Sequence, residues 1–170
     1  VPTLEGDDGQ GGFEPTLNEL CPDCQMESLD IPQESIGVDS PARVVSALQA
    51  NPNINYVVGP LGDLFIGLPG ALSDAGLADQ VTLVTHDQNP TLSADVEDGT
   101  IAAVVGFPGP EEMFQVTDTF LRYFANVDFS PNSDDFPSWI ITKGQVPSTT
   151  ENYPLVEDYQ AQYKALWGLG

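Results

Sequence analysis

One aspartate stands where this chain could bind a polar ligand. Asp87 follows the apolar run 81–85, which is typical of a strand buried in a parallel sheet. Ligands of open α/β sheets lie beyond the carboxyl ends of the strands. A carboxylate there can accept hydrogen bonds from neighbouring hydroxyls of a sugar or polyol. The alternative is that Asp87 only caps a turn or the next helix.

Two neighbours in the pattern add to this picture. Phe107 follows a second apolar run, 101–105, and could offer an apolar face to a sugar ring; the alternative is an ordinary core position. His86 is the single histidine, and beside an aspartate it more often forms a structural pair than a catalytic one. Because the chain has no Walker loop, no Gly-x-Ser-x-Gly elbow and no EF-hand spacing, we expect no enzyme activity, no cofactor and no metal site.

The two cysteines form the motif Cys21-Pro22-Asp23-Cys24 in an expected turn. The acidic neighbours Glu19 and Asp23 disfavour a reactive thiolate, and two ligands are too few for a closed zinc site. We therefore favour a structural disulfide between Cys21 and Cys24, with two inert thiols as the alternative. A disulfide indicates an extracytoplasmic address.

The composition excludes several classes of partner. The chain of 170 residues has 4 Lys and Arg against 26 Asp and Glu, a formal net charge of −22. Such an acidic protein has no basic patch for nucleic acid or for an anionic membrane surface. It also contains no apolar run of about 18 residues that could span a membrane. The length fits one domain, or one lobe of a larger protein.

The rest of the sequence alternates between strand and helix patterns. This alternation predicts an α/β fold: a doubly wound, mostly parallel sheet with helices on both faces. Ser40 is the expected N-cap of a helix that begins at Pro41 and ends at Asn51-Pro52, and Pro69 predicts a kink or a late start. The predicted strands are 1–4, 25–31, 54–58, 81–85, 101–105 and 138–142; the other predicted helices are 13–20, 63–75, 91–98, 111–126 and 152–167.

An ordered series of segments also resembles a known family. The run 46–52 precedes the strand 54–58, Gly67 is followed by Ala71-Leu72 and Ala75-Gly76, and the next strand ends in Asp87. The run 96–104 then leads to Pro108 and a long helix. Over roughly residues 1–146 the chain resembles the C-terminal half of type 1 periplasmic binding proteins, the ribose-binding-like sugar receptors of ABC transporters.

The resemblance implies a solute-binding component of an ABC import system, which closes on a sugar or polyol and delivers it to a membrane permease. Asp87 matches the family's sugar-binding aspartate, whereas Phe107 falls where many members have Gln or Asn. Leu61 falls where ribose binders have Asn, and Asp63 could replace a lost aspartate nearby. The opening loop would bring Asp8 and Gln10 to the ligand. Alternatives are the ligand-sensing domain of a sugar-responsive transcriptional regulator, or a stand-alone interaction lobe.

The same resemblance implies a division of the chain. Residues 1–106 would form the core of the C-terminal lobe, 107–137 a hinge crossing and a helix that belongs to the N-terminal lobe, 138–146 a returning strand, and 147–170 a helical extension. In the family, the N-terminal lobe covers the helix that corresponds to 111–126. With this missing N-terminal lobe, the helix would be left without its cover. We expect this segment to fold back on the chain or to self-associate.

Overall fold

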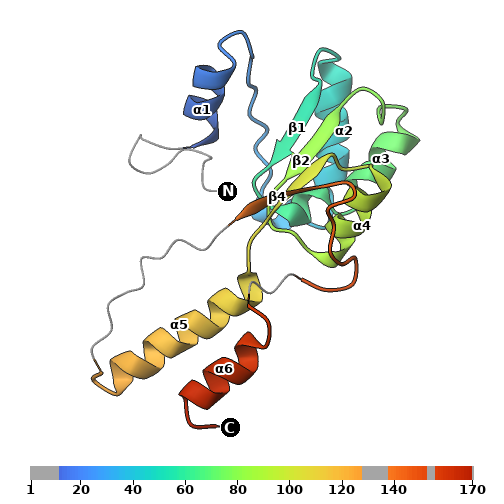
Figure 1. The fold of residues 1–170 in the computed structure, drawn as a ribbon. Helices are drawn as coiled ribbons and strands as arrows, with labels where there is room; N and C mark the ends of the chain where they lie inside the picture. Colours follow the sequence, from blue (N-terminus) through green and yellow to red (C-terminus); the bar gives the residue numbers. More distant parts are fainter. Residues whose placement is uncertain (1–11, 128–137, 153–155, 170) are drawn as a thin grey trace. The chain divides into compact units, whose positions relative to one another are not determined.

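The computed structural model describes residues 12–127, 138–152 and 156–169 (Figure 1). Its strands β1 (Tyr56–Gly59), β2 (Thr82–Thr85), β3 (Ala103–Gly106) and β4 (Trp139–Thr142) form one sheet in the order β1-β2-β3-β4. β2 and β3 are parallel, with Val84 opposite Ala103, and β4 runs antiparallel to β3. The predicted α/β class, with a mostly parallel sheet flanked by helices, is confirmed.

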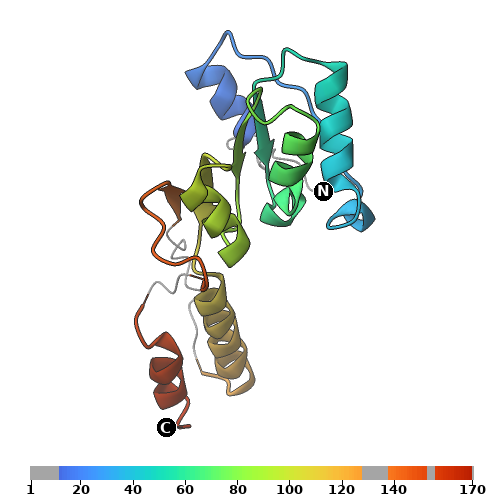
Figure 2. The same ribbon diagram turned by 90° about the vertical axis from the view of Figure 1, so that its right-hand side faces the viewer.

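The chain divides into two compact units, residues 1–82 and 83–170. The first unit contains α1 (Phe13–Leu20), η1 (Gln33–Ser35), α2 (Ser40–Ala50), η2 (Gly62–Phe65) and α3 (Leu68–Asp74). α2 and α3 lie side by side, and their buried side chains form a core with η2 (Figures 1 and 2). This core consists of Val44, Leu48, Leu64, Phe65, Leu68 and Leu72.

Glycine is required at the end of β1. A Cβ atom built on Gly59 would lie 2.0 Å from Cε2 of Phe65, which is 1% exposed. The bare backbone therefore lets the phenylalanine ring fill the core directly against β1.

Three local predictions in the first unit have different outcomes. Pro69 produces a late start, because α3 begins at Leu68 with the proline in its first turn. Ser40 is not the N-cap: Asp39 occupies that position, and the Ser40 hydroxyl is buried without a hydrogen-bond partner among the described residues. The strand at 25–31 is also wrong, because residues 24–32 have no regular structure. Its apolar residues at 26, 29 and 31 do not keep the two-residue period of a half-buried strand.

The turn after α1 contains the predicted disulfide. Cys21 and Cys24 are bonded, and the Cys24 amide donates to the Cys21 carbonyl at 2.9 Å. The predicted strand 1–4 lies outside the described residues.

The second unit is built around α4 (Pro90–Asp98), which packs on β3 and β4. The helix ends at Gly99, which adopts the left-handed conformation that is common directly after the last helical turn. The core of this unit consists of Leu83, Leu92, Val96, Ile101, Val104 and Ile141. In the described part of the chain, no helix is long and apolar enough to cross a membrane.

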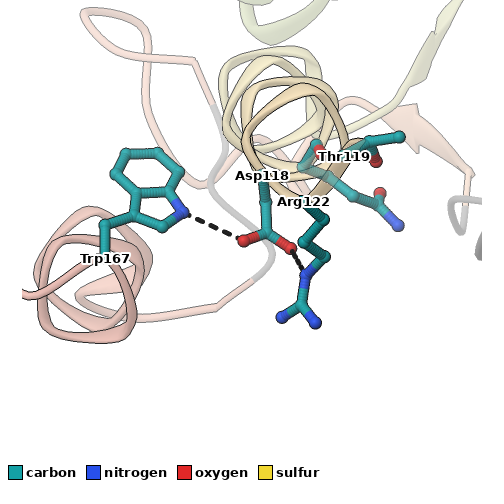
Figure 3. A network of polar contacts seen from close by, with 5 residues as sticks. Asp118, Thr119, Arg122 and Trp167 are labelled. Atoms are coloured by element: carbon teal, nitrogen blue, oxygen red, sulfur yellow. Dashed lines mark hydrogen bonds and ion pairs between the residues drawn. The ribbon is translucent and has the colours of Figure 1, made fainter. Parts of the chain in front are cut away.

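The unit also contains a pair of helices, α5 (Gly109–Phe124) and α6 (Tyr159–Leu166), which lie side by side in both views (Figures 1 and 2). Phe114 of α5 stacks on Trp167 with ring centroids 5.7 Å apart, and Tyr159 meets Phe114 edge-on at 5.2 Å. The Trp167 indole Nε1 donates to Asp118 at 3.0 Å, and Arg122 Nε donates to the other oxygen of Asp118 at 2.6 Å (Figure 3). The helix predicted at 152–167 is therefore shorter than expected and covers one face of α5.

Nearby charges and burial shift the pKa of two side chains in this helix pair, Asp118 and Tyr163. Burial by itself would raise the pKa of Asp118, but the hydrogen bonds from Arg122 and Trp167, with the charge of Arg122, outweigh it and lower the pKa below its usual value. Burial, with the nearby carboxylates Glu111 and Asp118, raises the pKa of Tyr163. The Asp118 carboxylate is thus held in its charged form by Arg122 of the same helix and by Trp167 at the end of α6.

The opposite face of α5 has no such cover from the described residues. A stripe at helical spacing remains 41–75% exposed: Met113, Val116, Phe120 and Phe124. The expectation that this segment must find a partner is thus met on one face only.

Candidate functional site

The turn that leaves β2 places Asp87 beside β3. β2 ends at Thr85, and the Gln88 amide still donates to the Val105 carbonyl of β3 at 3.3 Å. Between them, Asp87 adopts a φ of 61°, in the left-handed region that aspartate tolerates better than most residues. The side chain is 36% exposed at the carboxyl end of the strand, where the sequence predicted it.

Asp87 does not cap the helix that follows. Asn89 is the N-cap of α4, and its side-chain oxygen accepts a hydrogen bond from the Leu92 amide at 3.0 Å. Pro90 occupies the first turn, as expected for a capped helix. Capping of the next helix, one of the alternatives to ligand binding, is therefore not the role of the Asp87 carboxylate.

The carboxylate is paired with the neighbouring histidine instead. His86 Nδ1 lies 2.5 Å from Asp87 Oδ1, and the His86 side chain is 43% exposed. The imidazole also stacks on Phe107, with centroids 5.6 Å apart and an interplanar angle of 24°. Phe107 follows β3, and because β2 and β3 are parallel neighbours, the two loops meet at the same sheet edge.

A buried amide supports this turn from below. Gln88 is 8% exposed, and its Nε2 donates to the hydroxyl of Ser93 on α4 at 2.8 Å. Ser93 is completely buried. This hydrogen bond connects the residue after Asp87 to the first turns of α4 and so restricts the backbone next to Asp87.

The other predicted site residues lie elsewhere in the chain. Leu61 is half-buried and precedes η2, while Asp63 is exposed in the first turn of η2. Both belong to the first unit. Asp8 and Gln10 lie outside the described residues. The structure thus brings together Asp87 and Phe107, with His86 between them.

His86 is the contact residue that sequence reasoning placed only as a structural pair. The sequence position of His86 could have indicated a contact with the ligand. His86 directly precedes Asp87 and follows β2, which is the neighbour of β3 in the sheet, and Phe107 follows β3. Among the described residues, no group of three or more His, Cys, Asp or Glu side chains could hold a metal ion. The arrangement can offer hydrogen-bond acceptors beside an aromatic surface, which suits binding of a hydroxylated ligand.

No protein-family model matches this sequence, and no curated protein matches it. Solved structures share its fold. An ABC transporter solute-binding protein from Agrobacterium vitis with bound D-fucose has a TM-score of 0.64 at 21% identity, covering 74% of this chain and 44% of that chain. A sugar ABC transport substrate-binding protein from Bordetella parapertussis 12822 has a TM-score of 0.62 at 19% identity, covering 88% and 53%.

A periplasmic solute-binding protein from Actinobacillus succinogenes 130z with bound D-allose has a TM-score of 0.56 at 21% identity, covering 63% and 37%. This chain spans about half the length of these proteins, or less. It has the fold of a sugar-binding periplasmic protein of ABC transporters, and the match extends over one part of that fold.

Proposed function

We propose that this chain is a sugar-binding lobe of an ABC-type solute-binding protein, with Asp87 as its central ligand contact. The observation that carries the proposal is the position of Asp87. It lies just beyond the carboxyl end of β2, it is partly exposed, and it does not cap α4, because Asn89 does. Its Oδ2 makes no hydrogen bond with the described residues and can accept one from a sugar hydroxyl.

The wider site is proposed from the same resemblance. Phe107 would pack against one face of the sugar, and Leu61, Asp63, Asp8 and Gln10 would add contacts from other loops. Phe107 in place of an amide suggests a ligand with a less polar face, such as a deoxysugar. Binding without turnover is the expected activity.

The partners of this lobe follow from its proposed role. A second, N-terminal lobe would close the site, and residues 107–137 would cross to it by a hinge, 138–146 would return, and 147–170 would form an extension. A membrane permease would receive the solute. The disulfide Cys21–Cys24 supports an extracytoplasmic location, where such bonds persist.

Calorimetric titration with D-fucose, D-allose, D-glucose and D-galactose tests the proposal. We expect binding of at least one sugar, and a loss of about tenfold or more in affinity for Asp87→Asn, because a charged acceptor is lost. Asp79→Asn removes the same charge from an exposed position and is the matched control. Equal affinity of the two variants, or no binding of any of these sugars to the parent chain, would contradict the proposal.

A stand-alone interaction lobe is the second candidate, favoured by the exposed stripe on α5. The stripe of Met113, Val116, Phe120 and Phe124 is of the kind that marks a protein contact. Self-association through 111–126 would then be visible by analytical ultracentrifugation. Phe120→Glu should abolish a dimer without changing sugar affinity, whereas a monomer at all concentrations would remove this candidate.

A further inference from the structure

We propose that His86 determines the specificity of the Asp87 site by fixing the orientation of the carboxylate and by adding a second polar contact. The inference rests on the sugar-binding function proposed above. It concerns a residue that the resemblance does not assign to the ligand. The ligand class is a neutral sugar with two hydroxyls close enough to reach both side chains.

The first step is the direction of the hydrogen bond. An ionised carboxylate can only accept, so the proton of a neutral His86 ring lies on Nδ1 and is donated to Asp87 Oδ1. This leaves one carboxylate oxygen, Oδ2, for a ligand hydroxyl. It also leaves His86 Nε2 without a proton, as an acceptor that has no partner among the described residues.

The second step is the anchoring of the ring. An exposed aspartate alone would sample several rotamers, and ordering it on binding costs free energy. The stack on Phe107 restricts the imidazole, and the imidazole in turn restricts Asp87. The carboxylate is therefore oriented before a ligand arrives, which is the condition for discrimination between epimers.

The third step concerns charge. Two acceptors side by side match two hydroxyl donors, and they repel a carboxylate or phosphate on the ligand. The net charge of −22 acts in the same direction. Neutral sugars should therefore bind and sugar acids of the same shape should not.

Two variants separate the roles of His86. In His86→Asn, the side-chain amide can replace Nδ1 as the donor to Asp87. His86→Phe keeps only the stack on Phe107. The control is Asp79→Asn, at an exposed position outside the site.

The first readout needs no ligand, because His86 is the only histidine and its ring signals assign themselves. Long-range ¹H–¹⁵N spectra at pH 8 should report the Nδ1–H tautomer in the parent chain and in Asp79→Asn, with a changed tautomer ratio in Asp87→Asn. A predominant Nε2–H tautomer in the parent chain would overturn the inference.

The second readout is the ratio of affinities for D-allose and its epimer D-glucose. We expect His86→Phe to change this ratio about tenfold and His86→Asn to restore part of it. An unchanged ratio in His86→Phe would overturn the specificity role. If no sugar binds the parent chain, the proposed function fails, and the tautomer still decides whether His86 orients Asp87.

Discussion

Two aspartates in the second unit lie beside aromatic rings, and they differ in how many carboxylate oxygens already accept a hydrogen bond from the protein. Asp118 has both oxygens occupied, one by Trp167 and one by Arg122, and its side chain is only 17% exposed. Asp87 has one oxygen engaged by His86 and is 36% exposed. In the first arrangement both oxygens accept a hydrogen bond from the protein: the Arg122 bond lies within α5, and the Trp167 bond joins α5 to the end of α6. The second arrangement leaves one oxygen for a hydrogen bond from another molecule.

The largest effect on the helix pair is expected from a substitution at Trp167. Trp167→Ala removes the stack on Phe114 and one bond to Asp118, so the helix pair should lose about 2–3 kcal/mol. Amide hydrogen exchange in residues 159–167 should accelerate about 30- to 150-fold, because each 1.4 kcal/mol is a factor of about ten. Trp167→Phe keeps a stacking ring and should cost about 1 kcal/mol. The exposed Leu166→Ala is the control, and an effect as large as that of Trp167→Ala would show that the aromatic stack is not what holds α6.

Asp118→Asn tests whether charge matters on the helix-joining side. The pKa of Asp118 is lowered in the folded chain, so its charged form stabilises the pair above the ordinary aspartate value near pH 4. That stabilisation is lost as the pH falls through the lowered pKa. We expect Asp118→Asn to cost about 1–2 kcal/mol at pH 7 and to remove this loss in acid.

The measurement is Trp167 fluorescence against pH in a Trp139→Phe background, which leaves one tryptophan. A Trp139→Phe chain with native Asp118 is the control. The same acid transition in both proteins would mean that other carboxylates govern the docking of α6.

Asp87→Asn tests the other side of the comparison. Its carboxylate is partly exposed, and an amide oxygen can still accept from His86, so we expect a change in unfolding free energy within about 0.5 kcal/mol. Thermal unfolding at pH 7 measures it. A loss as large as that for Asp118→Asn would assign Asp87 a structural role and weaken its assignment to ligand binding.

Asp95 on α4 supplies a third case, a half-buried carboxylate with no side-chain partner among the described residues. Burial, and then the charge of Asp98, raises the pKa of Asp95. Because the folded value is raised, the ionised form costs stability at neutral pH, and stability recovers as the pH falls towards the ordinary value. Asp95→Asn should stabilise the chain by about 0.5 kcal/mol or less at pH 7 and have no effect near pH 4. Destabilisation at pH 7 would contradict this.

Local patterns in the sequence predicted much of what surrounds Asp87. The apolar run before it, the start of α4 near Pro90 and its end at Gly99 all depend on residues within a few positions of one another. The disulfide Cys21–Cys24 was predictable for the same reason. The strand predicted at 25–31 was wrong because the prediction rested on apolar content alone: the apolar residues do not alternate with the two-residue period, and strand formation also depends on a pairing partner.

The contacts that complete the two aspartates lay beyond such reasoning. Trp167 and Asp118 are separated by 49 positions. The sequence pattern of either helix by itself does not indicate that α5 and α6 pack together. His86 and Phe107 meet only because two parallel strands end together. Sequence spacing identified Asp87 as a candidate, and tertiary packing decides which of its oxygens is free.

Gly59 and Phe65 have a consequence for how the sequence can change over generations. Because a methyl group at position 59 would occupy the place of the Phe65 ring, neither residue can change size alone without a loss of packing. A larger residue at position 59 requires a smaller one at position 65, and each single change leads through a less stable intermediate. The two positions should therefore covary. A relative with a side chain at position 59 should have a side chain smaller than phenylalanine at position 65.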